Sequence, residues 1–101
     1  MGTALVTGAS AGLGLEFAWQ LATARHDVVL VARHADRLDR VATQLRAAAA
    51  VRTEVIVADL ADRDDVDRVA ARLTCDENPV GLLVNNAGFS PGETFVDADL
   101  A

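Results

Sequence analysis

The sequence predicts an α/β protein with a doubly wound parallel sheet in three layers, α/β/α. Three observations support this fold class. Short apolar, β-branched runs alternate with stretches of helical periodicity along the 101 residues. The runs are almost continuously apolar, as expected of strands buried on both faces of a parallel sheet. No internal repeat or low-complexity linker interrupts the alternation, which requires parallel strands joined by right-handed crossovers.

Four strands are expected: Thr3–Thr7, Asp27–Ala32, Thr53–Ala58 and Val80–Asn85. Doubly wound connections predict that they lie in the order third, second, first, fourth. Pro79 ends the helical pattern before the fourth strand, since proline cannot continue a helix.

Three helices are expected, at Leu13–Ala24, Ala35–Ala49 and Asp62–Leu73. Asp62 is expected to cap the third helix, and acidic residues follow it where the helix dipole favours them. Apolar residues at i, i+3, i+4 and i+7 define an inner face on each helix. Helix by helix, these residues are Gly14, Phe17, Ala18, Leu21 and Ala22; Leu38, Val41, Ala42 and Leu45; and Val66, Val69, Ala70 and Leu73.

Composition excludes several classes of protein. All nine basic residues are arginine, the net charge is −6 and the pI is about 4.6, which argues against a nucleic-acid partner. No apolar run approaches the roughly 20 residues of a membrane span, and no signal peptide is evident. Cys75 is the single cysteine, so neither a disulfide framework nor a metal site is expected. We therefore expect one cytoplasmic domain.

A glycine-rich loop directly follows the first strand, with glycines at positions 8, 12 and 14. Glycine allows the backbone to approach a phosphate closely, and the following helix directs unpaired N–H groups at the anion. The spacing differs from G-x-G-x-x-G, and the G-K-[ST] of a P-loop is missing. A tight strand-to-helix turn without a ligand remains the alternative for this motif taken alone.

Two further motifs stand at strand ends: Asp59-Leu60 after the third strand and Asn85-Asn86-Ala87-Gly88 after the fourth. In a doubly wound sheet, ligands bind outside the carboxyl ends of the strands, where all three motifs fall. With Thr7-Gly8-x-x-x-Gly12-x-Gly14, these motifs make the chain resemble the short-chain dehydrogenase/reductase family, and the resemblance covers essentially the whole chain.

The resemblance implies a Rossmann-like NAD(P)-binding domain over residues 1–101. Asp59 would bind the adenine amino group, with the Leu60 backbone beside it, and Asn85 would brace neighbouring strands. The residues implied to line the pyrophosphate and its ribose are Gly8, Ser10, Ala11, Gly12, Leu13 and Gly14, and those near the nicotinamide-side ribose are Asn86, Ala87 and Gly88. The alternatives are that Asp59 only starts a turn before the Asp62 cap, and that the two asparagines are turn residues.

The end of the second strand indicates which cofactor binds. An acidic residue there usually holds a free 2′-hydroxyl, but this chain has Ala32 followed by Arg33. A guanidinium grips a 2′-phosphate that a carboxylate would repel, so NADP(H) is expected over NAD(H). Arg37 could add charge from the same side, although an ordinary surface residue is the better interpretation for it. His34 is expected to be a solvated loop residue that touches the site only by adjacency.

Catalysis is not expected from these residues. The family reduces carbonyls or oxidises alcohols with a Ser, a Tyr and a Lys, and this sequence contains no Tyr and no Lys. The sequence therefore predicts the N-terminal cofactor-binding portion of an NADP(H)-dependent oxidoreductase acting by hydride transfer, inactive as a 101-residue chain. A small carbonyl or alcohol substrate would need the missing C-terminal half. The alternatives are a stand-alone nucleotide-binding module and a structural or interaction protein that kept the fold.

Truncation after the fourth strand has predicted consequences. The segment Val80–Val84 would be an exposed apolar edge, and one sheet face over the first and fourth strands would lack covering helices. Such surfaces favour self-association. Residues 89–101 would be poorly ordered or fold back over the open face.

Overall fold

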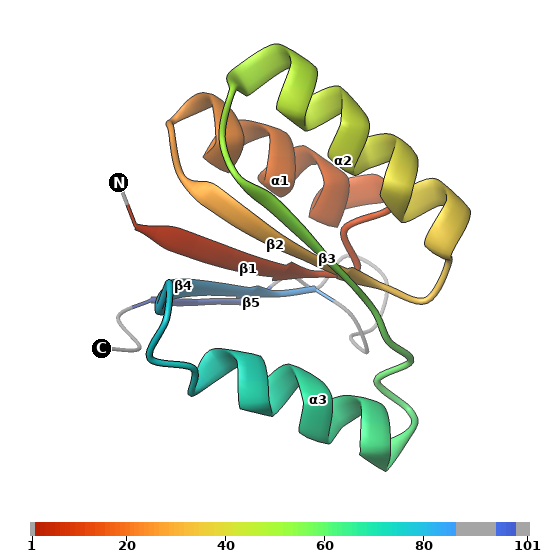
Figure 1. Cartoon of the computed structure of the whole chain (residues 1–101). Helices are drawn as coiled ribbons and strands as arrows, with labels where there is room; N and C mark the ends of the chain where they lie inside the picture. The colour runs from red at the N-terminus through yellow and green to blue at the C-terminus, as the bar shows by residue number, and fades with distance from the viewer. Residues whose placement is uncertain (1, 87–94, 99–101) are drawn as a thin grey trace.

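The computed structural model describes residues 2–86 and 95–98, which form one sheet between two helical layers (Figure 1). Helices α1 and α2 cover one face of the sheet, and α3 covers the other. The elements, in chain order, are β1 (Thr3–Thr7), α1 (Gly12–Thr23), β2 (Asp27–Ala32), α2 (Ala35–Ala49), β3 (Thr53–Val57), α3 (Arg63–Leu73), β4 (Val80–Asn85) and β5 (Phe95–Ala98).

The strand order is β3-β2-β1-β4-β5, and the first four strands are parallel. The predicted doubly wound α/β fold, its three layers and the order of its four parallel strands are therefore confirmed. Element bounds differ from prediction by one residue at α1, β3 and α3, where Asp62 is the N-cap residue and lies outside the helix.

The predicted open edge at β4 is wrong. Strand β5 pairs with β4 in antiparallel register, from Leu82↔Ala98 to Asn85↔Phe95, so β4 is an interior strand. An unpaired strand leaves a row of backbone N–H and C=O groups without partners, and a short antiparallel return satisfies them. Self-association stays a prediction, but it no longer follows from an open edge at Val80–Val84.

The layer formed by α1 and α2 holds the larger core cluster. Leu30 of β2 and Leu38 and Leu45 of α2 are completely buried there. The predicted inner face of α2 is confirmed in full, and Gly14, Ala18 and Ala22 of α1 are buried. The larger side chains of α1, Phe17 and Leu21, are half-buried and pack against the same cluster.

The α3 layer is thinner, and the predicted inner face of α3 is only partly correct. Val69 is buried and Leu73 is half-buried, but Ala70 is exposed and Val66 is 41% exposed. In the described part of the chain α3 is the only helix on this face. Residues of α3 beside the line along which it contacts the sheet therefore have no neighbouring helix to cover them and are exposed to solvent. The prediction that this face of the sheet is uncovered over β1 is wrong, because Leu5 of β1 is completely buried on the α3 side of the sheet.

Strand β3 lies at one edge of the sheet, and arginine side chains donate hydrogen bonds to two of its carbonyl groups that point away from β2. The Arg52 carbonyl accepts from the β2 amide of Val28, so alternation along the strand directs the Thr53 and Val57 carbonyls outward. Arg46 of α2 donates to the Thr53 oxygen (2.6 Å) and Arg68 of α3 to the Val57 oxygen (2.5 Å).

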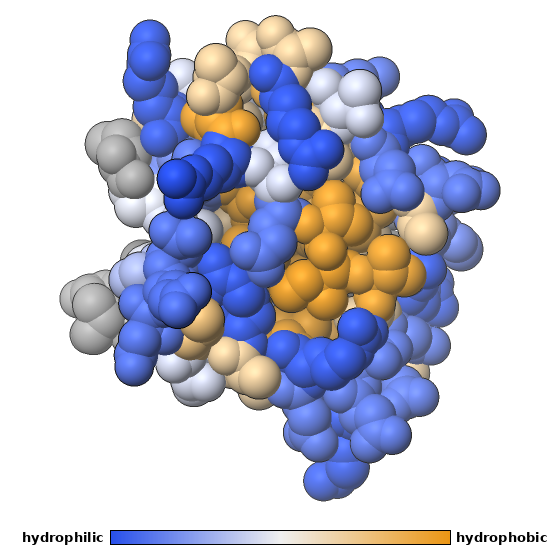
Figure 2. Space-filling model, viewed as in Figure 1, coloured by the Kyte–Doolittle hydropathy of each residue, from blue (hydrophilic) through white to orange (hydrophobic). Residues whose placement is uncertain are grey.

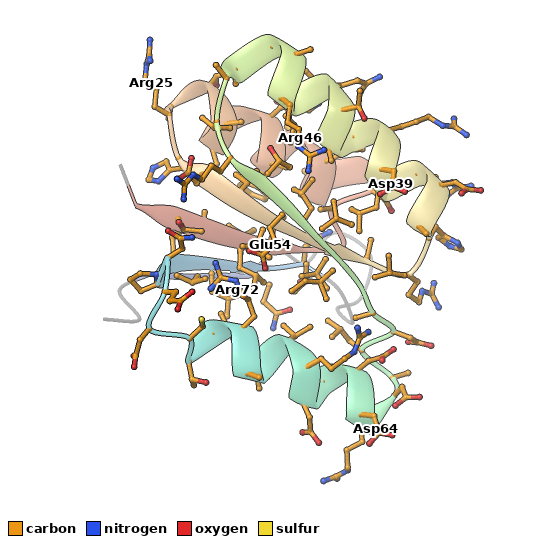
Figure 3. All side chains as sticks on the ribbon, viewed as in Figure 1. Arg25, Asp39, Arg46, Glu54, Asp64 and Arg72 are labelled. Atoms are coloured by element: carbon orange, nitrogen blue, oxygen red, sulfur yellow. The ribbon has the colours of Figure 1, made fainter. Side chains whose placement is uncertain are left out.

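An ion pair joins α3 to the same strand. Arg72 of α3 donates to Glu54 of β3 at 2.8 Å, and Figure 3 shows the two side chains meeting between the helix and the sheet. Charged groups that cover an edge strand oppose pairing with another chain. Within the described residues, no helix is long and apolar enough to cross a membrane.

Candidate functional site

A cavity of about 570 Å³ lies at the carboxyl ends of β1, β2 and β3. Six residues predicted for the site line it: Gly8, Ser10, Ala11, Arg33, Asp59 and Leu60. His34 and Arg37 also line it, together with Val31 and Ala32 of β2, Ala58 directly after β3, and Ala61 in the turn before α3. The structure thus brings together segments that are up to about fifty residues apart in the sequence.

Backbone hydrogen bonds join these three strand ends. The Ala9 N–H donates to the Val31 oxygen (3.1 Å), and the Ala58 N–H donates to the Ala32 oxygen (2.9 Å). The glycine loop, the arginine after β2 and the aspartate after β3 therefore hold fixed positions around one cavity.

The glycine loop needs glycine for two separate reasons. Gly8 (φ 64°) and Gly12 (φ 60°) adopt left-handed conformations that side chains disfavour. Gly14 is buried, and a Cβ on it would overlap the Gly8 carbonyl oxygen and lie 3.0 Å from the Asn86 side-chain nitrogen. The start of α1 can therefore sit against the loop only because residue 14 has no side chain.

The N-terminus of α1 differs from those of the other two helices. Ala11 at its N-cap provides no side-chain hydrogen bond, and its first turn contains no acidic residue. By contrast, α2 has Asp36 in its first turn, and α3 has the Asp62 cap followed by Asp64 and Asp65. Within the described residues, neither the N-cap nor the first turn of α1 supplies a side chain that neutralises the positive end of its dipole, where Gly12 and Leu13 lie exposed.

Positive side chains border the cavity on the β2 side. Arg33 and Arg37 are both exposed cavity-lining residues, and Asp59 lines the same cavity. Arg37 was expected to be an ordinary surface residue, but the fold places both arginines on the same cavity. The sequence signal for this arrangement is the spacing of one helical turn between Arg33, just before α2, and Arg37 in its first turn.

At the end of β4, the asparagines are tied to β1 through Thr7. The buried Thr7 hydroxyl donates to the Asn85 side-chain oxygen (3.0 Å) and accepts from the Asn86 N–H (2.8 Å). The expectation that Asn85 braces neighbouring strands is confirmed. Sequence reasoning missed this role of Thr7. The predicted site residues Ala87 and Gly88 lie outside the described residues.

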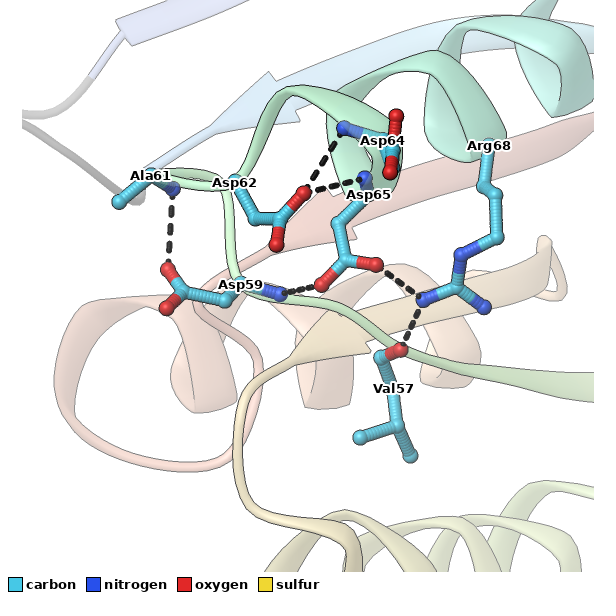
Figure 4. Close-up of polar contacts among 7 residues, drawn as sticks. All are labelled: Val57, Asp59, Ala61, Asp62, Asp64, Asp65 and Arg68. Atoms are coloured by element: carbon cyan, nitrogen blue, oxygen red, sulfur yellow. Dashed lines mark hydrogen bonds and ion pairs between the residues drawn. The ribbon is translucent and has the colours of Figure 1, made fainter.

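Asp59 sits in a tight turn between β3 and α3 (Figure 4). Its carboxylate accepts from the Ala61 N–H at 2.9 Å, and its own N–H donates to the Asp65 carboxylate at 2.8 Å. Asp65 also accepts from Arg68 at 3.0 Å. The hydrogen bond from Asp59 and the Arg68 guanidinium hold the pKa of Asp65 below its ordinary value, against an opposing effect of desolvation.

Taken together, a doubly wound sheet with a glycine loop and polar strand ends around one cavity defines a Rossmann-like domain. A family model described as short chain dehydrogenase matches residues 2–101. The chain belongs to this family, whose members are oxidoreductases.

Relatives of known function and structure agree with this assignment. The very-long-chain 3-oxoacyl-CoA reductase of Aspergillus clavatus is 44% identical over 87 residues, which is 86% of this chain. The bulky-bulky ketone specific alcohol dehydrogenase from Comamonas testosteroni has a TM-score of 0.83 and 43% identity over 88% of the chain. A short-chain dehydrogenase from Sphingobium yanoikuyae, solved in complex with NADPH, has a TM-score of 0.84 and 43% identity over 89% of the chain.

These relatives are considerably longer than this sequence. The chain spans 25% of the Aspergillus reductase, 36% of the Comamonas enzyme and 35% of the Sphingobium enzyme.

Proposed function

We propose that residues 1–101 form the NADP(H)-binding domain of a short-chain dehydrogenase/reductase that acts on a carbonyl or a secondary alcohol. One observation carries the proposal: a single cavity joins the glycine loop, next to the uncapped N-terminus of α1, to Arg33 at the end of β2. The glycine loop and the helix N-terminus suit a diphosphate, and the Arg33 guanidinium suits a 2′-phosphate.

The residues present fit this cofactor. The loop from Gly8 to Gly14 would hold the pyrophosphate with its backbone N–H groups, helped by the α1 dipole. Arg33 would bind the 2′-phosphate, with Arg37 adding charge. Asp59 and Leu60 would contact the adenine, and Asn86, Ala87 and Gly88 would lie by the nicotinamide-side ribose. The NADPH complex of the Sphingobium relative supports the choice of cofactor.

The chemistry follows from the cofactor and the family. When bound, NADPH supplies a hydride to a carbonyl carbon. The residues of this chain would bind and orient the cofactor, but they offer no tyrosine or lysine for proton transfer at the substrate oxygen, since the sequence has neither. We infer that the 101-residue chain binds NADP(H) without reducing a substrate. Because the sequence lacks both tyrosine and lysine, the second candidate function is a nucleotide-binding module that catalyses no reaction.

The experiment is a comparison of NADPH and NADH binding by calorimetry with wild-type chain and the Arg33→Ala variant. We expect wild type to prefer NADPH and the variant to lose about tenfold in NADPH affinity, the value of a charge-assisted phosphate contact. NADH affinity should change little.

Arg52→Ala is the matched control, because it removes the same charge at the opposite, amino-terminal end of the strands. If Arg33→Ala leaves NADPH affinity unchanged, or if wild type binds NADH more tightly, the phosphate assignment is wrong.

A further inference from the structure

We propose that Asp65, which does not line the cavity, is a positioning residue that orients Asp59 and thereby sets the preference of the site for adenine over a purine without a 6-amino group. The inference rests on the proposed function, because it concerns the adenine end of the same site.

Asp65 is in the first turn of α3 and reaches back to the end of β3. One of its carboxylate oxygens accepts from the Asp59 N–H at 2.8 Å, and the other accepts from Arg68 at 3.0 Å. The same Arg68 nitrogen donates to the Val57 carbonyl oxygen at 2.5 Å. Figure 4 shows this as one connected chain of contacts from β3 through α3 to the Asp59 turn.

These contacts fix the backbone on both sides of the Asp59 side chain. The peptide before Asp59 is held by Asp65, and the peptide after it is held because the Asp62 N–H donates to the Asp59 carbonyl oxygen at 2.9 Å. The direction of a Cα–Cβ bond follows from the two peptide planes that flank it. Of these two restraints, the one from Asp62 is a bond between backbone groups, which a substitution leaves in place. The other comes from the Asp65 side chain, so a substitution can remove it.

The orientation of Asp59 determines how the site distinguishes bases. A carboxylate is an acceptor only, so it favours the 6-amino group of adenine and disfavours the 6-carbonyl oxygen of hypoxanthine. Two carboxylate oxygens offer about four acceptor positions, so the bond from Ala61 leaves capacity for a base. Without Asp65 the carboxylate would keep its bond from the Ala61 N–H, but the backbone that carries it would lose the restraint on the Asp59 N–H. A shift of that backbone would misalign the carboxylate with the base and weaken the discrimination, because the geometry of a hydrogen bond determines its strength.

The test measures the ratio of the dissociation constants for NADPH and its deamino analogue, nicotinamide hypoxanthine dinucleotide phosphate. We expect wild type to bind NADPH about tenfold more tightly than the analogue, as one hydrogen bond to a charged group allows. In Asp65→Ala the ratio should fall to about threefold or less. Asp65→Asn should restore most of it, because its amide oxygen still accepts from the Asp59 N–H.

Asp64→Ala is the matched control. Asp64 carries the same charge in the same helical turn, but it joins this network only by donating its backbone N–H to Asp62. A general loss of helix stability would act alike in both alanine variants and would leave the base ratio unchanged. Asp59→Ala, alone and combined with Asp65→Ala, gives the ratio expected when the base contact is absent.

The outcomes separate the two proposals. If wild type binds neither nucleotide, the proposed function fails. If wild type binds both but Asp65→Ala retains the wild-type ratio, the inference about Asp65 is overturned and the proposed function stands. The inference is also overturned if the double variant loses more discrimination than Asp59→Ala alone, since Asp65 would then act independently of Asp59.

Discussion

Helices α2 and α3, on opposite faces of the sheet, have similarly amphipathic sequences, yet they bury very different shares of their inner faces. In α2, all four residues of the predicted apolar stripe are buried, and α1 packs beside it on the same face of the sheet. In α3, only Val69 is buried, and Val66 on the same stripe is 41% exposed. The difference shows that periodicity identifies the side of a helix facing the core, whereas neighbouring helices decide how far around the helix burial extends.

The same contrast is visible on the surface. Figure 2 shows apolar surface between the α1–α2 layer and α3, in the region of β3. Val57 of β3 and Val66 of α3 are the large apolar residues of these two elements with the greatest exposure. A stability difference between the two layers follows, and three substitutions test it in order of expected effect.

Leu38→Ala should have the largest effect. Leu38 is completely buried in the α1–α2 layer, so its truncation removes apolar contacts and leaves a cavity. We expect a loss of about 3 kcal/mol in the free energy of unfolding, measured by urea denaturation. Arg40→Ala, on the exposed face of the same helix, should change it by less than about 0.5 kcal/mol. A loss below about 1 kcal/mol for Leu38→Ala would mean that this layer is not the main core.

Asp62→Ala should have an intermediate effect, because α3 depends on local interactions where burial is limited. The Asp62 carboxylate accepts from the Asp64 and Asp65 N–H groups. Loss of this cap should cost about 1 kcal/mol, and Asp62→Ser should recover most of it. His34 is the N-cap of α2 and makes no side-chain capping bond, so His34→Ala is the matched control and should be nearly neutral. Equal costs at the two caps would contradict the contrast.

Val66→Ala should have the smallest effect. A side chain that is 41% exposed loses little apolar burial, and alanine has the higher helix propensity. We expect a change below about 0.5 kcal/mol in the same urea experiment. Val41→Ala, which truncates the same side chain at 5% exposure in α2, should cost at least about 1 kcal/mol. A comparable cost at Val66 would show that this flank of α3 is covered in solution.

The contrast also explains where sequence-based prediction succeeded. Strands β1, β2 and β4 and helix α2 have the predicted bounds, because their hydrophobic patterns are long, regular and end at clear signals such as Pro79. The site residues at the ends of β1, β2 and β3 could be placed on one cavity in advance, because parallel strands present their carboxyl ends at one edge.

The features that prediction missed depend on contacts between distant residues. The pairing of β5 with β4, the Thr7 bonds to Asn85 and Asn86, and the reach of Asp65 to Asp59 have no periodic signal in the sequence. For Asp65, position alone indicated a favourable charge at a helix N-terminus. Its carboxylate instead holds the turn that carries a cavity-lining residue.

The sequence by itself determined the three helices, the four parallel strands with their order in the sheet, and the residues at their carboxyl ends, because local periodicity and glycine geometry depend on near neighbours. The tertiary structure alone decided which faces are fully buried, that β5 and not β4 forms the second edge, and which side chains hold the candidate site residues in place. Those properties depend on what packs against each element in space, and neighbours along the chain do not specify it.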